Sequence, residues 1–182
     1  MERRKNAVKI VLEGYSVKPL TLDDSATLQD LYERCADYAL LVDGAPPSPT
    51  AARDEFSAVP EGKGLDDKFM FGLFRSEGLA GLLESIRHYP DGDTWWLGLL
   101  MLEPDSRGQG VGAAFYRAFE RHVAQQGAAH IMLSVVDANK QGSRFWQRLG
   151  FEEVRETEPK RFGSKTHVLS VMKKSVRGGG AT

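Results

Sequence analysis

A glycine-rich turn between an apolar strand and an amphipathic helix constrains this chain more than any other feature. The turn is Arg107-Gly108-Gln109-Gly110-Val111-Gly112, and an apolar run over residues 95–102 precedes it. Apolar residues recur at steps of three and four over residues 111–123, which predicts a helix with one buried face. The first N–H groups of a helix lack intrahelical partners and carry a partial positive charge. The sequence therefore predicts an anion site at this turn, with phosphate as the expected ligand.

Two explanations of the turn remain open on its residues alone. Its glycines carry no side chains that would keep a ligand from the N–H groups, and Arg107 adds a cation at the mouth. The same glycines would also serve a closely packed connection between strand and helix. The spacing matches neither the dinucleotide fingerprint Gly-x-Gly-x-x-Gly nor the triphosphate loop that ends in Gly-Lys followed by Ser or Thr.

The turn resembles motif A of the Gcn5-related N-acetyltransferase (GNAT) superfamily, whose pattern is Arg/Gln-x-x-Gly-x-Gly/Ala. Arg107, Gly110 and Gly112 meet that pattern here. The resemblance implies that backbone amides of the turn hold the pyrophosphate of acetyl-coenzyme A. It also implies that the preceding strand hydrogen-bonds the pantetheine arm near Leu100 and Leu102. The residues expected to bind the cofactor from this motif are Leu100, Leu102, Arg107, Gly108, Gln109, Gly110, Val111 and Gly112.

A second block, over residues 131–151, resembles motif B of the same superfamily. It reads as a buried strand over residues 131–136 followed by a short helix, with Asn139 near the helix start and Gly150 as its stop. Many relatives carry a tyrosine on this helix that serves the leaving thiolate, but the matching position holds Trp146. An indole cannot give up a proton near neutral pH, so the role of general acid does not transfer. Asn139 and Trp146 are expected beside the cofactor, with Trp146 mainly in packing.

The resemblance implies an α+β fold. We expect a central mixed, mostly antiparallel twisted sheet of six to seven strands with helices on both faces. The strands that end at Leu102 and Val136 should be parallel and splayed, and pantetheine should enter the gap between them. The length of 182 residues favours one domain, expected over residues 1–176. Residues 177–182 contain three successive glycines and are expected to form a flexible tail.

Other patterns predict the remaining elements. Thr21-Leu22-Asp23-Asp24 looks like a capping box that opens a helix reaching to about Tyr38. Further expected elements are an extended segment over 8–20, a short helix over 48–57, a hairpin of strands over 69–74 and 79–89, and closing strands over 152–156 and 165–172. The resemblance places Tyr38 and Phe56 at the acceptor pocket, and a place at the edge of the core explains them equally well.

The strand over residues 95–102 contains no ionisable residue, although some relatives place a glutamate base there. Glu84 and His88 lie four residues apart on the preceding predicted strand, so alternation puts both on one sheet face. They are the best candidates for the catalytic base, with Tyr38 and His167 as weaker ones. A structural glutamate and an ordinary strand-end histidine are the alternatives.

Composition excludes several classes of function. The formal net charge of -1 gives no bulk attraction to nucleic acid or membrane, and no His, Cys or carboxylate cluster has metal spacing. The single cysteine, Cys35, cannot form an intramolecular disulfide and is expected to be buried. No apolar run reaches eighteen residues, and the charged start Met-Glu-Arg-Arg-Lys is not followed by one, so a cytoplasmic location is expected. A monomer or a homodimer is expected, and no motif distinguishes the two.

The leading interpretation is an acetyl-coenzyme-A-dependent N-acetyltransferase. Direct transfer in a ternary complex is expected, because no cysteine lies near the motifs to form a covalent acetyl-enzyme intermediate. The acceptor is an amine, on a small molecule or a protein, that no motif identifies. The alternative is a non-catalytic acyl-coenzyme A sensor or assembly subunit.

Overall fold

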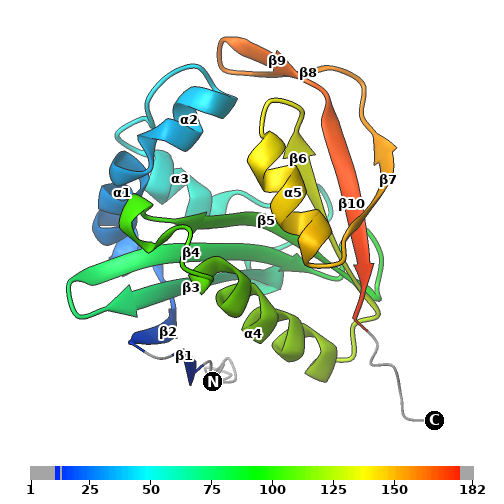
Figure 1. Cartoon of the computed structure of the whole chain (residues 1–182), viewed down its shortest axis with the longest axis horizontal. Helices are drawn as coiled ribbons and strands as arrows, with labels where there is room; N and C mark the ends of the chain where they lie inside the picture. Colours follow the sequence, from blue (N-terminus) through cyan, green and yellow to red (C-terminus); the bar gives the residue numbers. More distant parts are fainter. Residues whose placement is uncertain (1–10, 13, 177–182) are drawn as a thin grey trace.

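The computed structural model describes residues 11, 12 and 14–176 (Figure 1). One sheet has the strand order β1-β2-β3-β4-β5-β6-β10-β7, and β8 and β9 form a separate hairpin. Only β5 and β6 pair in parallel among the described strands. The predicted mixed, mostly antiparallel sheet is confirmed; it has eight strands when the two-residue β1 is counted. The expected tail over residues 177–182, and residues 8–10 and 13 of the expected first extended segment, lie outside the described residues.

The elements have the following bounds. The strands are β1 Val11–Leu12, β2 Tyr15–Pro19, β3 Lys68–Arg75, β4 Gly78–Arg87, β5 Thr94–Leu102, β6 His130–Val136, β7 Glu152–Glu156, β8 Lys160–Phe162, β9 Lys165–His167 and β10 Leu169–Ser175. The helices are α1 Ser25–Arg34, α2 Ala36–Val42, α3 Ala51–Ser57, α4 Val111–Gln125 and α5 Lys140–Arg148, with short 3-10 segments η1 Leu22–Asp24, η2 Leu65–Asp67 and η3 Pro104–Ser106.

Helices cover both faces of the sheet, as the resemblance implied. α4 and α5 bury their apolar stripes on one face, in a core that includes Trp95, Phe115, Phe119, Ile131 and Trp146. α1 and α3 cover the other face, in a second core that includes Leu28, Leu31, Met70, Leu82 and Met101. Each fully buried side chain of this size stabilises the fold by roughly 1.5–3 kcal/mol. The two cores hold the strands that carry the site in fixed positions.

The N-terminal capping box forms as predicted, but the helix after it is divided. The Thr21 backbone N–H donates to Asp24 Oδ2 at 2.8 Å, and the Asp24 N–H donates to the Thr21 carbonyl at 2.9 Å. The single helix expected to reach Tyr38 instead ends at Arg34, and α2 begins at Ala36. Cys35 between them has a non-helical backbone (φ -104°, ψ 25°) and a buried side chain, whose thiol donates to the Leu102 carbonyl.

The C-terminal part also differs from the expectation of two closing strands. Residues 165–167 pair with Lys160–Phe162 in the separate β8–β9 hairpin and do not start the last sheet strand. That strand, β10, begins at Leu169 and inserts between β6 and β7. β10 is antiparallel to both of these neighbours.

β5 and β6 pair only at their beginnings and then diverge, as predicted. Thr94–Trp96 pair with His130–Met132, and no pairing continues toward Leu102 and Val136. On its other side β5 carries a bulge, because Glu84 pairs with Leu99 while Ser85 pairs with Leu97, so Gly98 is left over. A bulge bends the strand that contains it. The bend accompanies the opening between β5 and β6.

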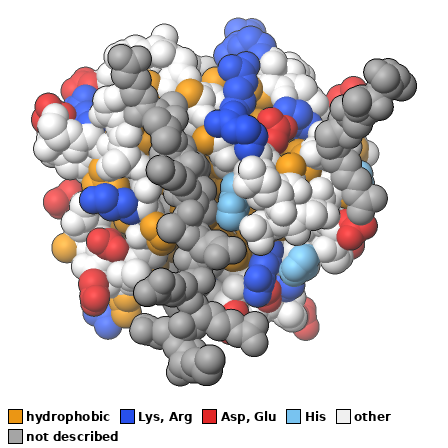
Figure 2. Space-filling view, turned by 90° about the horizontal axis from the view of Figure 1, so that it is seen from below, with side chains coloured by type: hydrophobic (Ala, Val, Ile, Leu, Met, Phe, Trp, Pro, Cys, Tyr) orange, Lys and Arg blue, Asp and Glu red, His pale blue; other side chains and the backbone are white. Residues whose placement is uncertain are grey.

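Figure 2 shows acidic and basic side chains on the same face, with several basic ones adjoining at the top of the view. Among the helices described, none has the length and apolar character that crossing a membrane requires.

Candidate active site

The glycine-rich turn lies between η3 and the start of α4. Gly108 and Gly110 have φ values of 74° and 80°, a left-handed conformation that glycine adopts without strain. A Cβ at either position would meet nothing within 4 Å, so the surrounding space is open. A Cβ on Gly112 would lie 3.3 Å from Leu102 Cδ1, because α4 packs closely on β5 there. Close packing therefore explains Gly112, whereas Gly108 and Gly110 border open space.

The backbone N–H groups of residues 108–113 make no hydrogen bond to any described residue, and the first helical bond is from Ala114 N to the Gly110 carbonyl. Side chains at the turn do not cover these donors. The Gln109 amide instead donates backward to the Asp105 carbonyl at 2.8 Å, and Val111 packs on the core. A row of free donors at a helix N-terminus suits a phosphate group.

Arg107 is not the free cation that its place in the sequence suggested. Its guanidinium forms two bonds to the Asp37 carboxylate of α2, at 2.5 and 3.1 Å, and its Nε donates to the Leu102 carbonyl at 2.8 Å. The hydrogen bond from Arg107 lowers the pKa of Asp37. Arg107 therefore ties α2 to the end of β5, and its charge is shared with a carboxylate beside the turn.

A cavity of about 60 Å³ occupies the gap between the diverging strands. Leu97–Leu100 line one side, Leu133–Val136 the other, and Tyr38, Asn139 and Trp146 complete it. Asn139 caps α5, because its Oδ1 accepts from the Gly142 N–H at 2.8 Å. Trp146 packs edge-on against Tyr116 and Phe151. Leu100, Asn139 and Trp146 are thus brought together at the gap, whereas Leu102 lies beyond it.

Glu84 is a buried residue of β4, and its carboxylate lies against Gly98 of β5. The residue is 5% exposed, and Glu84 Oε1 is 3.1 Å from Lys68 Nζ. A Cβ on Gly98 would overlap Glu84 Oε2. Burial raises the pKa of Glu84 to about 7; Glu55 raises it as well, and Lys68 acts in the opposite direction. A carboxylate with a pKa near neutrality is suited to proton transfer.

His88 does not share a face with Glu84, so that prediction is wrong. The alternation on which the prediction rested stops at Arg87, where β4 ends, so it does not extend to His88. His88 lies in the following turn with φ 54°, is exposed, and its Nδ1 is 2.6 Å from the Gly92 carbonyl oxygen. Nothing in this position supports a role as base.

The two weaker candidates for the base, Tyr38 and His167, lie in different surroundings. Tyr38 lines the gap; burial, followed by the charge of Asp43, raises its pKa, and its hydroxyl has no hydrogen-bond partner among the described residues. His167 is buried, and both its ring nitrogens are engaged, Nδ1 by Asp137 at 3.0 Å and Nε2 by the Val42 carbonyl at 2.8 Å. Tyr38 is therefore available for chemistry, and His167 is fixed by its neighbours.

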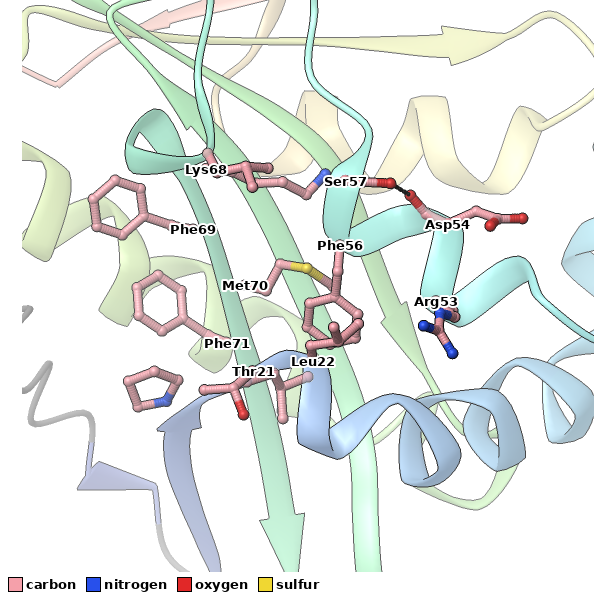
Figure 3. Close-up of a pocket in the computed structure, with 13 residues that line it drawn as sticks. Thr21, Leu22, Arg53, Asp54, Phe56, Ser57, Lys68, Phe69, Met70 and Phe71 are labelled. Atoms are coloured by element: carbon pink, nitrogen blue, oxygen red, sulfur yellow. Dashed lines mark hydrogen bonds between the residues drawn. The ribbon is translucent and has the colours of Figure 1, made fainter.

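Phe56 lines a different and larger cavity, of about 550 Å³, between α3, η1, η2 and β3 (Figure 3). Its walls are mostly apolar, and they include Leu20, Met70 and Phe71. Lys68 lines this cavity while its ammonium contacts Glu84. The larger cavity thus adjoins the buried carboxylate, but the free N–H groups and Tyr38 belong to the turn and the gap.

Sequence reasoning missed Lys68 and Gly98. Gly98 interrupts an apolar strand, a position that often marks a bulge or a close approach. Lys68 immediately precedes the apolar run of β3, and only the tertiary structure shows its ammonium against Glu84. Over residues 11, 12 and 14–176, no group of three or more His, Cys, Asp or Glu residues could hold a metal ion.

Comparison with known proteins finds solved structures that share this fold. Solved structures with the same fold include an acetyltransferase from Thermus thermophilus (22% identity, TM-score 0.70), aligned over 92% of this chain and 99% of that chain. The ribosomal-protein-S18-alanine N-acetyltransferase from Escherichia coli aligns over the same shares, with 17% identity and a TM-score of 0.68. Spermidine N-acetyltransferase from Vibrio cholerae, in complex with CoA and spermine, has 13% identity and a TM-score of 0.69, over 90% and 96% of the two chains.

A search of curated protein sequences finds no match to this chain. The model of the acetyltransferase (GNAT) family, by contrast, matches residues 25–151, which include the turn, the gap and Glu84. This protein therefore belongs to the acetyltransferase (GNAT) family.

Proposed function

We propose that this acetyltransferase transfers the acetyl group of acetyl-CoA directly to an amine, on a small molecule or a protein, within a ternary complex. The observation that carries the proposal is the buried Glu84 carboxylate, which lies against the strand that lines the gap. It supplies a proton acceptor close to the place where the family resemblance puts the acetyl thioester.

The cofactor fits the residues present. The free N–H groups of residues 108–113 provide donors for a pyrophosphate, and the splay between β5 and β6 offers a channel for the pantetheine arm. The Vibrio cholerae relative was crystallised with CoA, which supports the same cofactor here. Leu100 and Asn139, both at the gap, are positioned to contact the arm.

Glu84 would accept the proton of the incoming ammonium. Amines react as the neutral form, so an acceptor that arrives protonated must lose a proton before it attacks the thioester carbonyl. The raised pKa of Glu84 brings it near the pH at which such a base works best. The missing side chain of Gly98 lets the carboxylate lie directly against β5, the strand that borders the gap.

Tyr38 would return a proton to the leaving thiolate. It is the one ionisable side chain that lines the gap in the described part of the chain. Its raised pKa keeps the hydroxyl protonated, so it can donate. As the C–N bond forms, the C–S bond would break and the departing sulfur would take the Tyr38 proton. The phenolate would regain a proton, through water, from the nitrogen of the new amide, and Glu84 would release its proton to solvent.

A covalent acetyl-enzyme has no support in the arrangement. Cys35 is 1% exposed, and it does not line the gap. Burial raises the pKa of its thiol, which disfavours the thiolate that would act as nucleophile. Direct transfer is therefore the better interpretation.

An assay of thiol release over a broad amine panel tests the proposal. Free CoA should appear only when a suitable amine is present. Glu84→Gln should lower turnover by ~10²-fold or more while leaving acetyl-CoA affinity unchanged. His88→Ala serves as a control and should retain turnover. Binding of acetyl-CoA without amine-dependent thiol release would instead identify a non-catalytic acyl-CoA sensor, and unchanged turnover in both variants would point to another proton path.

A further inference from the structure

Lys68 holds together three groups from different parts of the fold. Its ammonium is 2.8 Å from Glu55 Oε1 of α3, 2.8 Å from the Ala58 carbonyl oxygen and 3.1 Å from Glu84 Oε1 of β4. The Lys68 side chain is only 5% exposed. Figure 3 shows it reaching from β3 along the wall of the larger cavity toward α3. Two hydrogen bonds and one ion pair, all to oxygen atoms, hold the ammonium in one position.

Two carboxylates share this one ammonium. When both are ionised, the cluster carries a net charge of -1 in a largely buried place, which is unfavourable. The Glu84 side chain is 7% exposed and the Glu55 side chain 28% exposed. Water therefore stabilises the charge of Glu55 better than that of Glu84, and Glu84 is the member that holds a proton more readily.

We infer that Lys68 and Glu55 are positioning residues that set, with opposite signs, the pH at which Glu84 can accept a proton. This inference rests on the proposed role of Glu84 as base. Lys68 favours the ionised carboxylate, and Glu55, on a different element, opposes it. The pH range of acetyl transfer then depends on α3, which does not contribute to the gap itself.

Other groups that face Glu84 do not carry a competing charge. Tyr32 of α1 is buried with its hydroxyl unpartnered among the described residues, and burial, with added repulsion from Glu55 and Glu84, raises its pKa, so it stays neutral. β5 presents Gly98, which has no side chain. The Glu84 pKa of about 7 agrees with this division: burial and Glu55 raise it, while Lys68 lowers it.

Two substitutions with opposite expected shifts test the inference. Lys68→Met removes the cation, so the rise of turnover with pH should move up by about 1 pH unit or more. Glu55→Gln removes the like charge, so the rise of turnover should shift to lower pH. Lys63→Met and Glu61→Gln are matched controls on the nearby loop and should leave the profile in place. Loss of packing alone would change turnover without moving the two midpoints in opposite directions.

A readout without turnover separates this inference from the proposed function. With glutamate labelled by ¹³C at the side-chain carboxyl, the free enzyme should show one resonance that titrates near pH 7 and disappears in Glu84→Gln. Its midpoint should move up in Lys68→Met and down in Glu55→Gln. If Lys68→Met does not fold, the shift of the titration midpoint in Glu55→Gln still tests whether Glu55 acts on Glu84.

Each outcome has a distinct meaning. A carboxyl titration that stays at one pH in both folded variants overturns the inference. A titration that moves as stated, with an unmoved activity profile, supports the tuning of Glu84 and refutes its role as base. Movement of both quantities together supports the inference and the proposed function.

Discussion

The carboxylate of Glu84 occupies the space that a side chain on Gly98 would need. Gly98 is the extra residue of the β5 bulge, and a Cβ there would overlap Glu84 Oε2. β5 can therefore line the gap and leave room for a charged group from the neighbouring strand. The position of the Glu84 carboxylate therefore depends on the absence of a side chain at Gly98.

Gly98→Ala should displace Glu84 and lower turnover by ~10²-fold, similar to loss of the base itself. Acetyl-CoA affinity should remain, because the turn is not altered. Gly92→Ala is the matched control, since a Cβ there meets nothing within 4 Å. Steady-state kinetics and calorimetry on both variants check the prediction, and full activity in a folded Gly98→Ala protein would contradict it.

Gly110→Glu should abolish acetyl-CoA binding, because it places bulk and negative charge among the free N–H groups of the turn. A positive φ also strains any side chain, so the control must share that strain. Gly127→Glu does so, with φ 84° and open space at the other end of α4. Calorimetry should show binding only in the control; wild-type affinity in folded Gly110→Glu would exclude the turn as the pyrophosphate site.

Tyr38→Phe should reduce the maximal rate of thiol release by about 10²-fold and leave acetyl-CoA affinity unchanged, because it removes the one ionisable group that lines the gap in the described part of the chain. Tyr89→Phe, at a tyrosine that packs on Trp96 outside the gap, is the control and should behave as wild type. A Tyr38→Phe enzyme with normal kcat would show that the thiolate leaves without help from this residue.

Stability should depend on pH through Glu84. Its pKa in the folded protein is about 7, raised from 4.5, so between these values the folded state binds more protons than the unfolded state. The free energy of unfolding should therefore fall as pH rises from about 5 to about 8, by up to about 3 kcal/mol for this group. Glu84→Gln should remove that part of the dependence. Urea unfolding at a series of pH values measures it, and parallel curves for the two proteins would count against the raised pKa.

Local sequence patterns were enough to predict the elements that form the candidate cofactor site. The strand, turn and helix of residues 95–123 are visible in sequence because apolar periodicity and glycine positions depend on neighbouring residues only. The capping box at Thr21 and Asp24 and the hairpin of β3 and β4 were predictable for the same reason. The splay of β5 and β6 followed from the family resemblance, and the register of the pair bears it out.

Only the tertiary structure decided the surroundings of the candidate base. Strand alternation placed Glu84 and His88 together, but β4 ends at Arg87 and His88 has a positive φ of 54°, which separates them. The sequence predicted a free cation at Arg107, but in the folded chain its guanidinium pairs with Asp37 of α2. Lys68 and Glu55 meet at Glu84 through contacts between elements that no local pattern encodes. Short-range sterics and periodicity determine elements, whereas the protonation of a buried carboxylate depends on every charge and dipole that the fold packs around it.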